Sequence, residues 1–78
     1  MTVAYDEILD FLTSGPNLEQ IVAFEHSPQT LARVQQLVER EAAESMTPEE
    51  REELREFRKA EYFFEQLKIR AQRRLERW

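Results

Sequence analysis

Three groups of side chains in this sequence are of types that can do chemistry: one histidine, three serines and a run of glutamates. His26 is the only histidine, and the chain has no cysteine. A lone imidazole cannot form a multi-histidine metal site, and a nucleophilic serine needs a base beside it. Ser14, Ser27 and Ser45 stand where turns and helix caps account for them. We therefore predict that the chain is not an enzyme, and that His26 is exposed in the link between two helices.

The glutamate run has the spacing of one helix face and could attract a divalent cation. It comprises Glu49, Glu50, Glu52, Glu53 and Glu56. Di-iron helical bundles need Glu-x-x-His pairs on several helices, and the chain has none. Arg51, Arg55 and Lys59 alternate with the acids at spacings that allow ion pairs along a helix, which favours a solvated face over a metal site. The chain also has only one glycine, which excludes a glycine-rich phosphate-binding loop. We therefore expect neither a bound metal nor a cofactor.

Length and composition limit the chain to one small core. It has 78 residues, of which 41% are hydrophobic and 35% charged. This size predicts a single helical domain over residues 1–78. No apolar stretch is long enough to span a membrane, and the first residues lack the pattern of a signal peptide. We expect a cytoplasmic protein that does not bind membranes.

Helix start and stop signals divide the chain into four helices. Gly15-Pro16 ends the first, Asn17 caps the second with Gln20 reaching back, and Ser27-Pro28 starts the third. Thr47-Pro48-Glu49-Glu50 is a full capping box before a stretch without Gly or Pro. The predicted helices are 3–14, 17–24, 28–44 and 48–78. The predicted fold is all-α, with three short helices packed on one long C-terminal helix in a small bundle.

Apolar spacing predicts which side of each helix faces the core. In the first helix the inward stripe is Tyr5, Ile8, Leu9 and Leu12, and in the third it is Leu31, Val34, Val38 and Ala42. In the last helix it is Leu54, Phe57, Ala60, Phe64, Leu67, Ala71, Leu75 and Trp78. Phe63 borders this last stripe, so we expect it to pack against an earlier helix.

The long helix carries a second group of residues away from that stripe. Aromatic and arginine side chains together are typical of the residues that dominate binding energy in protein interfaces. The predicted partner-binding residues are Tyr62, Ile69, Arg70, Arg73, Arg77 and Trp78. For Tyr62 and Ile69 the alternative of ordinary exposed apolar residues stays open, and a second copy of the chain is another candidate for covering this face.

Charge is distributed unevenly along the chain. Residues 1–46 contain two arginines and eight acidic residues, whereas residues 66–78 contain five basic residues and Glu76 alone as an acid. Cations near a helix C-terminus interact favourably with the helix dipole, and this accounts for part of the basic end. The basic end also permits a secondary interpretation as a nucleic-acid contact, although the acidic body repels phosphates.

The order of several segments resembles a group of small, uncharacterised bacterial proteins that are frequent in cyanobacteria. The segments are ILDFL at 8–12, SGP at 14–16, EQIVAF at 19–24, SP at 27–28, LVER at 37–40, MTPEEREEL at 46–54 and LKIRA at 67–71. Members of this group are often encoded beside a nuclease-like or toxin-like protein. The resemblance therefore implies an antitoxin-like companion role, and it assigns no functional residue.

These observations leave three functional hypotheses. The first is a non-catalytic, antitoxin-like module that binds a partner protein, for example a toxin or nuclease, through the long helix. The second is a nucleic-acid-binding regulator that uses the basic C-terminal turns. The third is a homodimeric structural protein.

Overall fold

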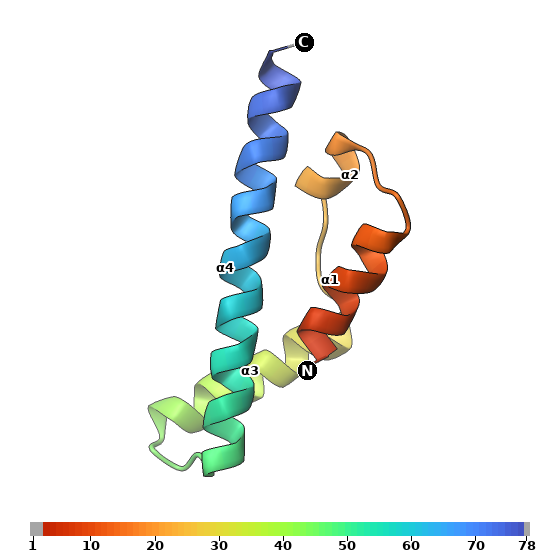
Figure 1. Cartoon of the computed structure of the whole chain (residues 1–78). Coiled ribbons are helices and arrows are strands. Elements are labelled where there is room, and N and C mark those ends of the chain that lie inside the picture. Colours follow the sequence, from red (N-terminus) through yellow and green to blue (C-terminus); the bar gives the residue numbers. More distant parts are fainter. Residues whose placement is uncertain (1–2, 78) are drawn as a thin grey trace.

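The computed structural model describes residues 3–77 and contains four helices (Figure 1). They are α1 (Val3–Thr13), α2 (Leu18–Val22), α3 (Pro28–Ala42) and α4 (Pro48–Glu76). There is no strand among residues 3–77, so the fold is all-α as predicted. The molecule measures 48 × 21 × 18 Å. The 29 residues of α4 account for most of that length, because an α-helix rises about 1.5 Å per residue.

The predicted caps fix the starts of α2, α3 and α4. The Asn17 side chain accepts a hydrogen bond from the Gln20 N–H at 2.8 Å, and the Gln20 side chain accepts one from the Asn17 N–H at 2.9 Å. Ser27 accepts from the Thr30 N–H at 3.2 Å. Thr47 and Glu50 form the same reciprocal pair as Asn17 and Gln20. The first three helices end one or two residues before the predicted ends, and Trp78, the predicted end of the last, lies outside the described residues.

Two residues with positive φ end α1 and α3. Gly15 has φ 74°, which glycine adopts without steric cost. Glu44 has φ 56°, a left-handed conformation that is unfavourable for a residue with a Cβ. The Ser45 N–H donates to the Arg40 carbonyl at 3.0 Å, and the Glu44 N–H donates to the Glu41 carbonyl at 3.1 Å. This is the Schellman pattern, and it directs the chain from α3 into α4.

The core forms where the short helices pack along one side of α4. Its buried centre consists of Ala4 and Ile8 from α1 with Phe57, Ala60 and Phe64 from α4. Aromatic rings extend this core towards α2. The Phe24 ring centroid lies 4.5 Å from that of Phe64 and 4.7 Å from that of Phe11. This packing agrees with the stripe predicted for the long helix, in which Leu54 and Ala71 are also buried.

Two predicted inward faces are partly wrong. In α1, Leu9 is 43% exposed, and the Phe11 ring packs against the core instead. In α3, Leu31, Val38 and Ala42 are exposed, while Thr30 and Leu37 are buried. The physical reason is that α3 presents only a narrow strip to the core, and Thr30, Val34 and Leu37 form that strip.

Three ion pairs join α3 to the first half of α4. Arg33 donates two hydrogen bonds to Glu53, at 2.8 and 2.9 Å, and Arg58 donates two to Glu41, at 3.0 and 2.8 Å. Arg40 also pairs with Glu50. A contact with two parallel hydrogen bonds, as in the first two pairs, fixes the orientation of the two helices as well as their separation. The three ion pairs hold α3 across α4 at the broad end of the molecule (Figure 1).

Candidate functional site

One long side of α4 faces away from the core, and we call it the outer face. Its residues recur at three- and four-residue intervals, which places them on one side of the helix. The outer face comprises Arg51, Arg55, Lys59, Tyr62, Gln66, Ile69, Arg70, Arg73 and Arg77. Gln66 is half-buried and the others are exposed. With five arginines and one lysine, the outer face is a basic surface about 40 Å long.

Tyr62 and Ile69 are the apolar members of the outer face. The side of α4 that packs on the core is already covered, yet Tyr62 is 69% exposed and Ile69 is 37% exposed. Single exposed apolar residues are ordinary, but these two are two helical turns apart and are flanked by arginines. The combination of large apolar area with directional donors is what protein interfaces select.

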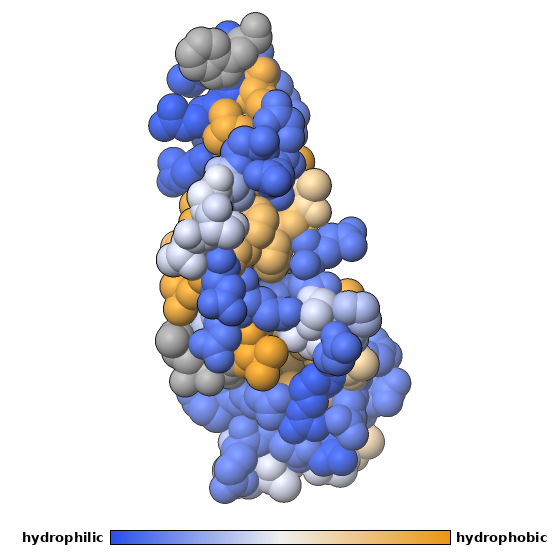
Figure 2. Space-filling view, turned by 90° about the vertical axis from the view of Figure 1, so that its right-hand side faces the viewer, coloured by the Kyte–Doolittle hydropathy of each residue, from blue (hydrophilic) through white to orange (hydrophobic). Residues whose placement is uncertain are grey.

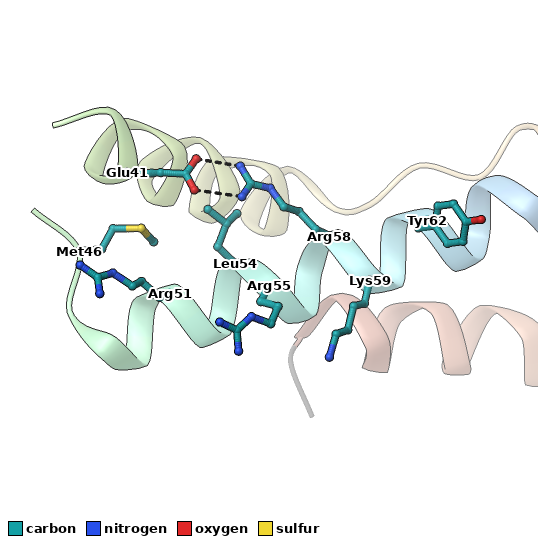
Figure 3. Close-up of a pocket in the computed structure, with 8 residues that line it drawn as sticks. All are labelled: Glu41, Met46, Arg51, Leu54, Arg55, Arg58, Lys59 and Tyr62. Atoms are coloured by element: carbon teal, nitrogen blue, oxygen red, sulfur yellow. Dashed lines mark hydrogen bonds and ion pairs between the residues drawn. The ribbon is translucent and has the colours of Figure 1, made fainter. Parts of the chain in front are cut away.

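A groove between α3 and α4 lies at the broad end of the outer face (Figure 3). This α3–α4 groove has a volume of about 540 Å³ and is lined by Glu41, Met46, Arg51, Leu54, Arg55, Arg58, Lys59 and Tyr62. Leu54 points towards α3, while Arg55 and Lys59 extend away from it. Glu41 neutralises Arg58, and its hydrogen bonds with Arg58 lower the pKa of the Glu41 carboxyl. Much of the basic charge here is therefore already paired.

A second groove, the α2–α4 groove, lies at the narrow end of the outer face. It has a volume of about 430 Å³ and is lined by Val22, Lys68, Ile69, Gln72, Arg73 and Glu76. Val22 comes from the last residue of α2, and the others come from α4. In a side view, apolar surface continues between hydrophilic side chains into this narrow half of the molecule (Figure 2).

The two halves of α4 differ in how their cations are compensated. In the first half, Arg55 pairs with Glu52 at 2.8 Å, Lys59 lies 3.7 Å from Glu56, and Arg58 pairs with Glu41. Among residues 3–77, no ion pair involves Arg70, Arg73, Arg74 or Arg77. Lys68 forms no ion pair there either, and its Nζ lies 5.9 Å from the centre of the Phe64 ring. The last turns of α4 therefore carry uncompensated positive charge.

The structure brings together most of the residues predicted to bind a partner. Tyr62 lines the α3–α4 groove, Ile69 and Arg73 line the α2–α4 groove, and Arg70 and Arg77 are exposed on the same helix face. Trp78 lies outside the described residues. Val22 and Lys68 also line the α2–α4 groove and were not among the predicted residues. Periodicity within one helix could not have identified Val22, since it reaches this site from α2.

The prediction that Phe63 packs against an earlier helix is wrong. Phe63 is 49% exposed, whereas its neighbour Phe64 is 3% exposed. The short helices cover only the side of α4 that carries Phe57, Ala60 and Phe64, and this coverage stops before Phe63. The exposed Phe63 ring therefore adds apolar area beside Tyr62.

The prediction that His26 is exposed is also wrong. Its side chain is 10% exposed, and its ring centroid lies 5.2 Å from that of Phe24 and 5.5 Å from that of Phe57. His26 Nδ1 lies 3.1 Å from Glu7 Oε1, and the Ser27 N–H donates to Glu7 Oε2 at 3.1 Å. Burial alone would raise the pKa of Glu7, but hydrogen bonds from Thr30, Ser27 and His26 together lower it. This polar contact joins α1 to the start of α3.

The glutamate run serves the fold. Glu50 accepts from Thr47 and Arg40, and Glu53 accepts from Arg33. The Thr47 N–H lowers the pKa of Glu50, and the Arg33 hydrogen bonds lower that of Glu53. Among residues 3–77, no three His, Asp or Glu side chains are grouped so that they could hold a metal ion. Within the same range, no helix has the length and apolar character needed to cross a membrane.

Comparison of the chain with protein-family models, with curated proteins and with solved structures finds no match.

Proposed function

We propose that this chain is a small non-catalytic module that binds a partner protein through the outer face of α4. The observation that carries the proposal is the exposed pair Tyr62 and Ile69 within a row of arginines on a helix whose opposite side is already buried. A helix that docks into a partner uses side chains spaced by three, four and seven residues, and Tyr62, Gln66, Ile69 and Arg73 have that spacing.

The uncompensated cations favour an acidic partner surface. Complementary charge speeds association and selects partners, while apolar contacts supply most of the affinity. The resemblance to bacterial companion proteins suggests that the partner is the product of a neighbouring gene, of toxin or nuclease type. In this proposal the chain acts as its antitoxin-like companion in the cytoplasm.

Co-purification with the neighbouring gene product tests the proposal. We expect the double variant Arg70→Glu with Tyr62→Ala to stay folded, since both side chains are exposed, and to lose co-purification. The matched control is Arg74→Glu with Leu31→Ala, which makes the same kinds of change at exposed residues outside the outer face. The control should co-purify at the wild-type yield.

Other outcomes would contradict the proposal. If the folded double variant still co-purifies at the wild-type yield, the outer face is not the contact surface. If the chain ignores the neighbouring protein and binds DNA with an affinity that falls steeply with salt, the basic turns serve nucleic acid instead. If it forms a stable homodimer through Tyr62 and Ile69, the outer face is a self-interface.

A further inference from the structure

The α2–α4 groove combines fixed apolar walls with a charged rim. Its apolar walls are Val22 and Ile69. Val22 follows Ile21, which packs against the core, and the reciprocal Asn17–Gln20 cap holds the start of α2. Ile69 lies between the half-buried Lys68 and the exposed Arg70 on a continuous helix. Both walls therefore belong to elements whose positions are set by packing elsewhere.

The rim of this groove is mainly positive. Lys68 and Arg73 line it, and Glu76 is the only acid in the lining. Neither cation is in an ion pair with any of residues 3–77. Lys68 and Arg73 are five residues apart, which is about 7.5 Å along the helix axis. Five residues also turn the helix by about 140°, so the two cations lie on either side of Ile69.

From these features we infer that the α2–α4 groove receives one apolar side chain of an acidic helix in the partner protein. That side chain lies between Val22 and Ile69, and carboxylates on either side of it pair with Lys68 and Arg73. The inference rests on the proposed function and specifies the chemistry of the partner segment. A phosphate backbone would use the cations but would leave the two apolar walls without contacts.

A defined peptide tests this inference without knowledge of the natural partner. The probe is a labelled, Glu- and Ala-rich peptide of about 20 residues, long enough to be partly helical, with one central leucine. The matched probe has alanine in place of that leucine. We expect the leucine peptide to bind about tenfold more tightly, because the groove removes the extra apolar surface from water. In NMR titrations the shifted amides should cluster at Val22, Ile69, Gln72 and Arg73.

Variants of the groove separate the contribution of its apolar walls to peptide binding from that of its cations. Val22→Thr keeps the side-chain shape and adds a hydroxyl, and Ile69→Gln keeps a helix-compatible residue at an exposed position. Each should abolish the preference for the leucine peptide and leave a weaker, salt-sensitive binding. Lys68→Gln with Arg73→Gln should weaken the binding of both peptides.

Several results would overturn the inference. Equal binding of the leucine and alanine peptides would mean that charge alone acts, and shifts confined to the α3–α4 groove would place the contact elsewhere. A poly-dT oligonucleotide that binds more tightly at these same residues would assign the groove to nucleic acid. If Val22→Thr and Ile69→Gln keep full binding to the neighbouring gene product while Arg70→Glu with Tyr62→Ala loses it, the proposed function stands and only the groove assignment fails.

Discussion

The two halves of α4 use the same kinds of residues for different purposes. In the first half, three of the four basic side chains pair with α3 or with neighbouring glutamates, as in Arg58–Glu41 and Arg55–Glu52, and Arg51 forms no ion pair among residues 3–77. In the second half, Arg70, Arg73 and Arg77 form no ion pair among residues 3–77. The sequence already shows part of this difference, because both halves are rich in arginine while the glutamates lie mainly in the first half. This difference indicates that the charged side chains of the first half stabilise the fold and that those of the second half are available for binding.

The largest effect is expected from breaking the buried side of the second half. Phe64→Ala removes a ring that contacts Phe11 and Phe24, and it should cost about 3–5 kcal/mol of unfolding free energy. A core of this size supplies only about that much, so the variant should be largely unfolded. Phe63→Ala is the matched control and should cost less than about 1 kcal/mol. Circular dichroism during urea unfolding measures both, and equal losses would contradict the assignment of inner and outer faces.

Acid should loosen the packing of α3 selectively. The carboxyls of Glu7, Glu41, Glu50 and Glu53 have pKa values below the ordinary 4.5 in the folded chain. The unfolded chain therefore binds protons first as the pH falls, so the stability that these groups contribute is present above pH 4.5 and is lost as the pH falls through their folded pKa values.

Urea unfolding at several pH values between 6 and about 3 measures this loss. Glu53→Gln should reduce the slope of stability against pH, because one of the four shifted groups is removed. Glu52→Gln, at an exposed neighbouring position, serves as the control. A stability that does not change over this range would show that the ion pairs between α3 and α4 contribute nothing.

A smaller, stabilising effect is expected at the turn that leads into α4. Glu44 has φ 56°, and glycine adopts this conformation without the penalty of a Cβ. Glu44→Gly should raise the unfolding free energy by about 0.5 kcal/mol, which is less than the full steric penalty because glycine also makes the unfolded chain more flexible. Glu44→Ala removes the charge but keeps the Cβ, so it should show no such gain.

Changing the exposed arginines at the end of α4 should affect stability least and binding strongly. Arg73→Gln with Arg77→Gln should change the unfolding free energy by less than about 1 kcal/mol, since both side chains are exposed. The same variant should lose most binding to the neighbouring gene product. Arg33→Gln, which breaks the pair with Glu53, should do the reverse and lower stability with binding intact. If both variants lost stability and binding to the same extent, the charged side chains of the two halves of α4 would not have different roles.

The helices can be predicted from local signals in the sequence, because the hydrogen bonds that start each helix join residues close together in the chain. Asn17, Ser27 and Thr47 act on backbone groups only three residues away. The buried stripe of α4 is also predictable, because a long helix packed along its length shows a regular apolar period.

The predictions of which side chains are buried are wrong where the burial depends on contacts with another helix. Whether Leu31 or Leu37 is buried depends on how α3 meets α4, and this is fixed by pairs such as Arg33–Glu53 that are 20 residues apart. His26 is largely covered by the ring of Phe24 in its own link and by the ring of Phe57 from α4. In the candidate site, Tyr62, Ile69 and the arginines could be found from helix spacing, whereas Val22 could not.

Light scattering of the chain expressed alone, and again after co-expression with the neighbouring gene product, distinguishes partner binding from self-association. We expect a monomer that becomes a complex of defined stoichiometry. We also expect Arg73→Gln with Arg77→Gln to leave the monomer folded and to prevent the complex. These two results would support partner binding through the outer face of α4. A stable homodimer that does not change on co-expression would contradict it, because the outer face of α4 would then serve self-association.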